Sequence, residues 1–339
     1  MATTAHPTRF ASHRDLARLP WFDLVDGRLT ADPSVGPAID LHTHLALAFV
    51  RPMAVDLQRA SERTEYYLPE ERGLDLDAYQ NLNFSAGDMS RLTRDLSIMS
   101  LTAGGMRATH TVPNLLRDMR ALGIDASVLL AIDWPALSNN ADSWLAAAKG
   151  EKALVVFGSV HPFTPNALSR LDAQIDLGAR GIKVHPAVQL VAPDHPLNLR
   201  IYRRCGERGI PVFWHCGPVE IEGAYARKLS QVRLYEKAIA ENPRTTFVLG
   251  HSGALQMETA VDYARRYPNV WLELASQGLS NVRRIFERAP RDRIVFGTDW
   301  PFYHQAIGLA KVCIAAEGDD ELRAAVLSGN AKRLLKLDA

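Results

Sequence analysis

The chain has 339 residues, of which 47% are hydrophobic and 23% are charged, as in ordinary globular proteins and unlike disordered chains. Its 39 basic and 38 acidic residues leave a formal net charge of +1, so the charge indicates neither nucleic acid nor an anionic membrane as a partner. The sequence contains no run of about 20 apolar residues, which is the length needed to span a membrane. The three cysteines form no CxxC pair, which is typical of free thiols in a reducing compartment. We therefore expect a cytoplasmic protein.

Residues 1–37 precede the first buried strand and are predicted to form an N-terminal extension. The first 14 residues contain arginines but no apolar run, so they do not resemble a secretory signal. A loose tail is the preferred interpretation of this stretch, and a transit peptide is the weaker alternative.

Eight short apolar runs follow along the chain, and each ends in a polar or glycine-containing turn. Most are apolar throughout rather than alternating, which is typical of parallel strands that are covered on both faces. The predicted strands are Ala38–His44, Ala126–Ile132, Leu154–His161, Gly181–His185, Ile210–His215, Thr246–His251, Val270–Leu274 and Arg293–Asp299.

Helical patterns lie between these runs. A helix is predicted to start at an N-cap on Thr164 and to end before Gly178, and others cover residues 197–208, 229–240 and 255–266. Eight strands that alternate with helices predict an α/β fold, a closed (β/α)8 TIM barrel over residues 38–339. A doubly wound open sheet is the main alternative, but no GxGxxG motif follows an early strand.

The segment between the first and second strands is too long for a single helix. It contains clusters of Arg, Glu and Tyr, a Gly104–Gly105 pair and several methionines. We interpret residues 46–123 as a mostly helical insertion that lies over the catalytic mouth of the barrel. A separate small domain is the weaker alternative.

Polar side chains gather at the carboxyl ends of the strands, where barrel enzymes build their active sites. They are His42, His44, Lys183, His185, His215, His251 and Asp299. His42 and His44 are two positions apart, so their imidazoles point to one side and form a chelating pair. His215 and Asp299 could add the nitrogen and the carboxylate oxygen that a divalent metal prefers. A single histidine here is more often a core residue, but four histidines and an aspartate at one end favour a metal centre.

This set of residues resembles the active site of the amidohydrolase superfamily of metal-dependent barrel enzymes. The segments 296–302 (FGTDWPF) and 327–335 (LSGNAKRLL) are similar to the amidohydrolase-related (amidohydrolase 2) branch, which also contains non-oxidative decarboxylases of aromatic acids. The likeness covers about residues 38 to 337 and is specific for metal binding, but not for a substrate.

The resemblance implies a role for each residue of the set. The residues that would hold a first metal ion are His42, His44, His215 and Asp299. His251 would either bind a second ion or contact negative charge that develops on the substrate. We expect zinc, with manganese as the alternative.

Lys183 decides between one ion and two. In two-metal relatives the corresponding lysine carries a carboxylate and bridges the ions, whereas one-metal relatives usually lack it. An unmodified lysine is a cation and a poor ligand, so the alternative is an ammonium that pairs with a carboxylate or with the substrate. The neighbouring segments favour one ion, and two ions stay the alternative.

Asp299 and His251 are the predicted catalytic residues. Asp299 beside a metal-bound water would accept its proton and pass it to the leaving group. The leading hypothesis is therefore a metal-dependent hydrolase of a small-molecule amide, ester or lactone. The alternatives are a metal-dependent non-oxidative decarboxylase of an aromatic or unsaturated carboxylic acid, and a barrel that binds a ligand without catalysis. The partner is a small molecule in each case, and the sequence leaves a homo-oligomer open.

Other residues near the strand ends have more than one interpretation. Arg107 and Arg227 could clamp a carboxylate, although solvated arginines are the default, and Asp40 is interpreted as a buried hydrogen-bonding residue. Several aromatic residues leave a planar substrate conceivable. They are Trp134, Trp214, Trp300, Phe302 and Tyr303.

Overall fold

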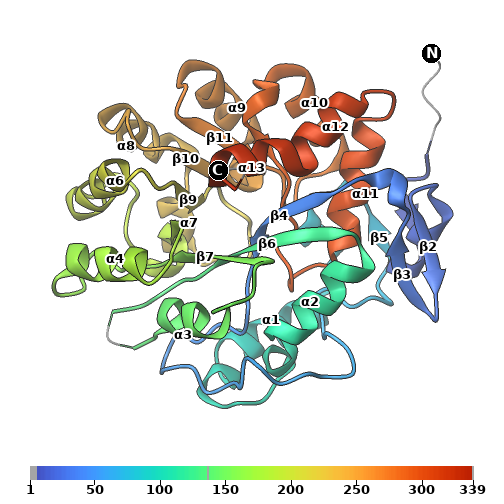
Figure 1. Cartoon of the computed structure of the whole chain (residues 1–339), viewed down its shortest axis with the longest axis horizontal. Helices are drawn as coiled ribbons and strands as arrows, with labels where there is room; N and C mark the ends of the chain where they lie inside the picture. The colour runs from blue at the N-terminus through green and yellow to red at the C-terminus, as the bar shows by residue number, and fades with distance from the viewer. Residues whose placement is uncertain (1–5, 136, 338–339) are drawn as a thin grey trace.

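A parallel sheet of eight strands forms the centre of the protein, and the helices are arranged around it (Figure 1). The computed structural model describes residues 6–135 and 137–337. Neighbouring strands follow one another in chain order. They are β4 (Ala38–Thr43), β6 (Ile124–Leu130), β7 (Leu154–Gly158), β8 (Gly181–Val184), β9 (Val212–His215), β10 (Phe247–Gly250), β11 (Val270–Glu273) and β12 (Ile294–Val295). The eight predicted strands and the predicted barrel are confirmed.

The first and last strands meet and close the sheet into a barrel. The backbone N–H of Asp299 donates to the carbonyl of His42 at 2.8 Å, and that of His44 donates to the carbonyl of Trp300 at 2.7 Å. A parallel bridge also joins Thr43 to Trp300. We call this junction of β4 with the end of β12 the barrel seam.

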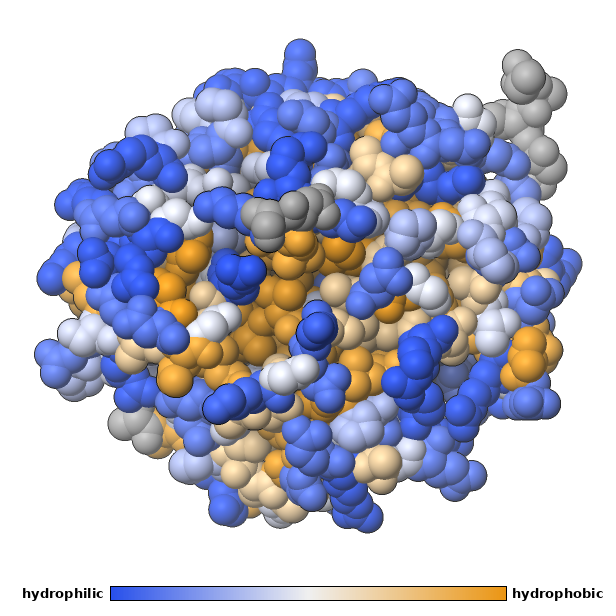
Figure 2. Space-filling model, in the orientation of Figure 1, coloured by the Kyte–Doolittle hydropathy of each residue, from blue (hydrophilic) through white to orange (hydrophobic). Residues whose placement is uncertain are grey.

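Apolar side chains fill the interior of the barrel. They come from all strands but β8, and three residues of α13 (Asn330–Leu335) join them. Burying one such side chain, for example Phe213, contributes about 1.5–3 kcal/mol. In Figure 2, hydrophobic residues gather near the centre of the face on which α13 lies, and hydrophilic residues surround them. This distribution is expected of helices that bury one side against the barrel and expose the other.

The helices outside the insertion follow the strands, as a (β/α)8 order requires. They are α3 (Asn140–Ala147), α4 (Ala167–Asp176), α5 (Pro186–Gln189), α6 (Pro196–Arg208), α7 (Ala224–Leu229), α8 (Glu236–Glu241), α9 (Met257–Arg266), α10 (Leu279–Arg288), α11 (Gln305–Ala315) and α12 (Asp320–Ala324). None of the helices within the described ranges combines the length and the apolar character needed to cross a membrane.

Two predicted helices differ from the structure. The first begins at Ala167 rather than after Thr164, because the N–H of Thr164 closes a turn onto His161 and Asn166 provides the N-cap in a left-handed conformation. The predicted helix over 229–240 is interrupted. The carbonyl of Ser230 accepts a hydrogen bond from the loop after β9, so regular helix resumes only in α8.

The insertion is helical only in its second half. Residues 44–73, all of which the structure describes, form neither helix nor strand, and β5 (Leu74–Asp75) follows them. The second half contains α1 (Ala86–Leu96) and α2 (Val112–Ala121). A capping box between Ser85 and Asp88 starts α1. The irregular half is fixed instead by contacts such as the Asn140 side chain, which bonds both the N–H and the carbonyl of Ala48.

The described part of the N-terminal extension is ordered, so the interpretation of a loose tail is wrong for residues 6–14. There β1 (Arg9–Phe10) pairs with β5 of the insertion. A hairpin of β2 (Phe22–Val25) and β3 (Arg28–Ala31) follows and buries Trp21. Residues 1–5 of the predicted extension lie outside the described residues, as do 338–339 at the end of the predicted barrel domain.

Candidate metal centre and substrate cavity

Two histidines at the end of β4, His42 and the following His44, converge on one aspartate after β12. The Nε2 atoms of His42 and His44 lie 3.4 and 3.2 Å from Oδ1 of Asp299. All three residues are buried, with exposed fractions of 1%, 4% and 9%. Asp299 has a φ of +64°, so a left-handed turn in the segment that follows β12 aims its carboxylate back at the end of β4. The structure thus brings together three of the four residues predicted to hold the first metal ion.

A register shift in β4 aims both histidines into the cavity. Leu41 belongs to the barrel interior, and strict alternation would send His42 to the opposite face. The pairing of β4 with β6 shifts between Asp40 and Thr43, as in a β-bulge. The shift lets Asp40 point outward, where it binds the Thr298 hydroxyl, while both histidines line the cavity.

Asp40 is a structural residue, as the sequence suggested. Its carboxylate accepts hydrogen bonds from the backbone N–H groups of His42 and Thr298 and from the side chain of Gln305. Burial raises the pKa of Asp40 to about 6, although these hydrogen bonds favour its ionised form. Asp40 therefore stabilises the barrel seam from the outer face of the sheet, and its carboxylate is not a metal ligand.

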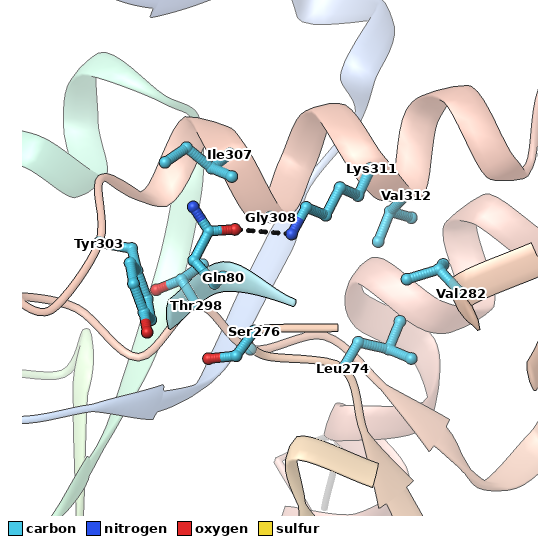
Figure 3. Close-up of a pocket in the computed structure, with 11 residues that line it drawn as sticks. Gln80, Leu274, Ser276, Val282, Thr298, Tyr303, Ile307, Gly308, Lys311 and Val312 are labelled. Carbon is cyan, nitrogen blue, oxygen red and sulfur yellow. Dashed lines mark hydrogen bonds between the residues drawn. The ribbon is translucent and has the colours of Figure 1, made fainter. Parts of the chain in front are cut away.

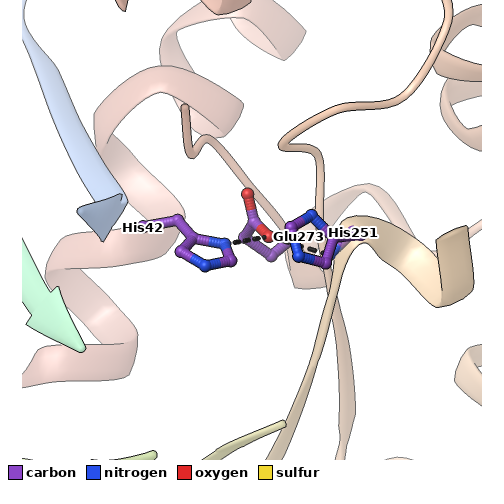
Figure 4. Close-up of side chains that lie close together, drawn as sticks. All are labelled: His42, His251 and Glu273. Atoms are coloured by element: carbon purple, nitrogen blue, oxygen red, sulfur yellow. Dashed lines mark hydrogen bonds and ion pairs between the residues drawn. The ribbon is translucent and has the colours of Figure 1, made fainter. Parts of the chain in front are cut away.

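Glu273, at the end of β11, joins His42 to His251 and escaped the sequence analysis (Figure 4). Its Oε2 lies 3.0 Å from Nδ1 of His42 and accepts the backbone N–H of His251 at 2.9 Å. Its Oε1 accepts the N–H of Ala275. Glu273 belongs to a second close group of metal-binding atoms with His42 and His251, but both of its oxygens are engaged. It therefore orients the histidines rather than binding an ion.

Burial raises the pKa of Glu273 to about 8, against the two backbone N–H groups that favour the ionised form. A nearby metal cation also favours the carboxylate. The glycine of the GTD motif makes room for this group. A Cβ at Gly297 would lie 2.1 Å from Oε1 of Glu273 and 2.9 Å from Cβ of His42. In the sequence, the only sign that Glu273 has a role in the site is its charge within an otherwise apolar strand.

His251 reaches the cavity from a turn with successive left-handed residues. Its φ is +56°, and Ser252, Gly253 and Ala254 also have positive φ angles. The side-chain amide of Gln277 holds the turn by donating to the carbonyls of His251 and Ala254 at 2.6 and 2.8 Å. The rings of His251 and His42 lie 4.8 Å apart, so His251 belongs to the same site.

Lys183 lies beside His42. Its Nζ is 3.5 Å from Nε2 of His42 and 4.5 Å above the ring of Phe213. Burial lowers the pKa of Lys183 to about 7, and the carboxylates of Asp299 and Glu273 oppose that shift. Its position is compatible both with a neutral amine and with a cation next to substrate.

His215, the fourth predicted ligand, lines the same cavity but lies outside both close groups of ligand atoms. Its ring stacks on that of His185 at 4.0 Å and lies 4.9 Å from that of His251. Among residues 6–135 and 137–337, its buried Nε2 has no hydrogen-bond partner. A buried imidazole nitrogen without a partner is unusual in a folded protein, unless a missing group completes it.

The donor set fits a divalent metal ion. Two imidazole nitrogens and a carboxylate oxygen converge, and a further imidazole stands in the same cavity. Zinc accepts this combination readily, and manganese tolerates it. Of the predicted residues, His42, His44 and Asp299 would be the core of such a site, and His215, His251 and Lys183 surround it.

A cavity of about 350 Å³ lies over this cluster, and most of its surface is apolar. Its apolar wall comes partly from the insertion, as predicted for a segment over the mouth. The apolar lining residues are Leu47, Phe49, Met89, Leu92, Leu96, Ile132, Ala187, Val188, Val219, Ile221 and Phe302. Among the described lining residues, Lys183 alone is a lysine or arginine, and Glu222 and Asp299 are the acids.

Neither arginine considered as a carboxylate clamp lines this cavity in the described structure. Arg107 is fully buried and donates to backbone carbonyls of the insertion, such as that of Leu47. Arg227 is exposed and bonds the carbonyls of Glu220 and Glu222. Of the aromatic residues singled out in the sequence, Phe302 and Tyr303 line the cavity, whereas the three tryptophans do not.

A small void of about 10 Å³ lies behind the wall formed by Ser276 and Tyr303 (Figure 3). Lys311 of α11 projects to it and donates to Oε1 of Gln80 and to the carbonyl of Gln277, both at 2.7 Å. Burial lowers the pKa of Lys311 to about 7. Because Gln277 also holds the turn at His251, these contacts connect α11 to the candidate metal centre.

Solved structures share this barrel at low sequence identity. An uncharacterised TIM-barrel protein from Bordetella bronchiseptica is 19% identical, with a TM-score of 0.62 over 88% of this chain and 98% of that chain. A 2,6-dihydroxybenzoate decarboxylase from Rhizobium is 18% identical, with a TM-score of 0.53 over 88% and 100%. A 5-carboxyvanillate decarboxylase from Novosphingobium aromaticivorans, complexed with manganese and a nitrobenzoic acid, is 15% identical, with a TM-score of 0.55 over 88% and 99%.

Among curated proteins, no significant sequence match was found. The sequence profile of the family described as amidohydrolase matches residues 39–337. This match spans the barrel, the insertion and every residue of the candidate metal centre. The chain therefore belongs to the amidohydrolase family.

Proposed function

We propose that the protein is a metal-dependent non-oxidative decarboxylase of a small carboxylic acid with an aromatic or unsaturated body. The composition of the cavity carries this proposal, because an apolar wall and a single lysine suit an apolar molecule with one carboxylate. A carboxylate loses its hydration in such a cavity, whereas carbon dioxide is neutral and has little hydration to lose. The surroundings therefore favour loss of the carboxylate.

The residues that would hold the ion are His42, His44, His215 and Asp299. When bound, a divalent metal supplies Lewis-acid polarisation of substrate oxygens. Lys183, 3.5 Å from His42, would bind a carboxylate oxygen, and the side chains of α1 would exclude water.

In the proposed reaction, the bond between the carboxylate carbon and the adjacent carbon breaks. Its electron pair stays on the adjacent carbon, and carbon dioxide leaves. That carbon then takes one proton, which Asp299 or His251 would deliver from the cavity wall. The acid thus becomes the corresponding hydrogen-substituted product, and no oxidant is needed.

The two similar structures described as decarboxylases are named for 2,6-dihydroxybenzoate and 5-carboxyvanillate, and the structure of the second contains manganese. This supports decarboxylation over the hydrolysis that the motifs first suggested. It also makes manganese as reasonable an occupant as zinc.

We propose one ion per chain, with Lys183 as an unmodified cation. Protein that is loaded with zinc in bicarbonate buffer should then bind one equivalent, and Lys183→Ala should keep that equivalent while KM rises. Two equivalents in the wild type, falling to one in Lys183→Ala, would instead establish a carboxylated, bridging lysine.

The function is tested with a panel of aryl and unsaturated carboxylic acids, and with esters, lactones and amides of similar size. A decarboxylase releases carbon dioxide and, in D2O, places one deuterium on the carbon that carried the carboxylate. Release of an acid from the esters, lactones or amides without carbon dioxide would establish a hydrolase. Turnover of neither group by zinc- or manganese-loaded protein would contradict both activities.

A further inference from the structure

Four histidines of the cavity have a ring nitrogen whose hydrogen-bond partner fixes the position of the proton. We propose that His185, unlike the other three, is a hydrogen-bond donor to an oxygen atom of the substrate and not a metal ligand. This rests on the proposed function only in taking the cavity as the substrate site. It concerns which of two chemically distinct nitrogens each ring presents to the cavity.

In three of these histidines, Nδ1 faces a hydrogen-bond acceptor. The Nδ1 of His42 faces Glu273 at 3.0 Å, and that of His44 faces the carbonyl of Leu130 at 2.8 Å. The Nδ1 of His251 lies 3.3 Å from the carbonyl of Ala275. A neutral imidazole carries one proton, so these rings hold it at Nδ1 and keep the Nε2 lone pair free for a metal.

His185 has the opposite arrangement. It precedes α5, and its Nδ1 accepts the backbone N–H of Val188 at 3.3 Å. If Nδ1 carried the proton, two N–H groups would face each other without an acceptor. The neutral ring therefore carries its single proton at Nε2. The backbone of His185 is itself fixed, because its N–H donates to Oε1 of Gln189 at 2.9 Å.

The protonated Nε2 of His185 has no acceptor in the protein within the described ranges, although the residue lines the cavity and is half-buried. Its ring is held parallel to that of His215 at 4.0 Å. A nitrogen that carries a proton has no lone pair in the ring plane for a metal. His185 is therefore equipped to donate, and a carboxylate, carbonyl or phenolic oxygen is the group that would accept.

His185 and Lys183 are two positions apart at the end of β8, so they present two donors on the same side of the cavity. A substrate oxygen on this side of the cavity is bound by the N–H groups of Lys183 and His185. On the side where β4 ends, His42 and His44 present nitrogen lone pairs to a metal. The cavity is thus divided between a face that binds an ion and a face that binds oxygen. The expected substrate carries oxygen on two sides of its reacting end.

The first experiment reads the tautomers directly by ¹⁵N NMR of the full-length protein labelled at histidine, with and without zinc. His161 is an internal reference, because its Nδ1 accepts the N–H of Phe163 and its Nε2 faces the carbonyl of Gln189. We expect His185 to show the same tautomer as His161 and to keep it on zinc addition, while Nε2 of His42 and His44 shifts. A proton on Nδ1 of His185, or a zinc-induced shift like that of His42, would overturn the proposal.

The second experiment compares His185→Leu, His185→Gln and the control His161→Leu. Zinc content should be equal in all three, and the affinity of zinc-loaded protein for benzoate, measured by calorimetry, should fall about 10-fold in His185→Leu only. The glutamine variant should recover most of the affinity because its amide donates. Loss of zinc in His185→Leu, or an unchanged benzoate affinity, would contradict the proposal. A failure of every acid to release carbon dioxide would overturn the proposed function but leave the tautomer result intact.

Discussion

Asp299 contacts both histidines of β4 through a single oxygen, which leaves its second oxygen for proton transfer. Asp299→Asn keeps the shape of the side chain but removes the carboxyl group that would carry and deliver the proton. We expect kcat to fall at least about 10²-fold, the usual scale for such groups, while the fold and most of the bound zinc remain. Steady-state kinetics with elemental analysis of the same samples tests this. Near-wild-type turnover in a zinc-loaded variant would be incompatible with the role.

Glu273 fixes the proton on Nδ1 of His42, so its loss should weaken metal binding without removing a ligand. In Glu273→Gln, an amide N–H₂ must face either His42 or the backbone N–H groups, all of which are donors. We expect the affinity for zinc to fall about 10–100-fold, as for other groups that orient ligands. Competition with a chromophoric chelator measures it.

Glu222→Gln is the matched control for Glu273→Gln. Glu222 lines the same cavity, and its Oε1 accepts the N–H of Val219 rather than facing a histidine. Its substitution should leave the affinity for zinc unchanged. Equal effects of the two substitutions would point to charge alone and contradict the orienting role of Glu273.

The sequence could predict that His42, His44 and Asp299 meet, because strand ends of a barrel share one face. It could not predict how the histidines turn inward, since the register shift after Asp40 depends on pairing with β6. Glu273 was missed because its role comes from contacts with His42 and His251, which no spacing in the chain reports.

The helix α1 covers the cavity with the side on which Leu92 lies, so a charge there should disturb substrate but not metal. We expect Leu92→Glu to raise KM, or the dissociation constant of benzoate, about 10-fold or more, because a buried carboxylate repels an acid. Zinc content should not change. Leu82→Glu, at an exposed leucine of the same insertion, is the control and should behave as wild type.

The helical turn His13–Arg18 of the extension buries a histidine whose two ring nitrogens have no partner in the described structure. Burial, with a contribution from His304, lowers the pKa of His13 to about 3. The unfolded chain binds a proton near pH 6.5 and the folded chain only near 3, so stability is lost as the pH falls through this range. At pH 5 the loss amounts to about 2 kcal/mol.

His13→Leu should remove this contribution, so the variant should lose less unfolding free energy than wild type between pH 7 and pH 5. Urea unfolding at the two pH values measures the difference. An identical pH dependence in His13→Leu and wild type would show that His13 does not titrate as described.

Elements with strong apolar patterns were predictable, and those fixed by polar contacts were not. The eight strands and the helices α6 and α9 follow the apolar residues of the sequence, because burial of those residues forms them. Residues 44–73 have no such pattern. Their path depends on distant side chains such as Asn140, so the expectation of a mostly helical insertion was too broad.

At the level of the complete barrel, metal binding should stabilise the fold, because the proposed ligands lie at the ends of strands that are far apart in the chain. Free zinc at 100 times its dissociation constant should add about 2.7 kcal/mol to the free energy of unfolding. Thermal unfolding with and without zinc should therefore show a melting temperature that is higher by a few degrees. The variant His42→Ala/His44→Ala should show no zinc-dependent rise, and an equal rise would place the binding elsewhere.

The barrel seam has a further consequence for the order in which the chain acquires its metal. During synthesis His42 and His44 leave the ribosome with β4, and His215 follows with β9. Three of the four proposed ligands are therefore made before Asp299. Asp299 joins them only when the seam hydrogen bonds form. The complete set of four proposed ligands would therefore exist only in chains that reach Asp299 and close the seam, and truncated products that lack Asp299 would hold an ion less tightly.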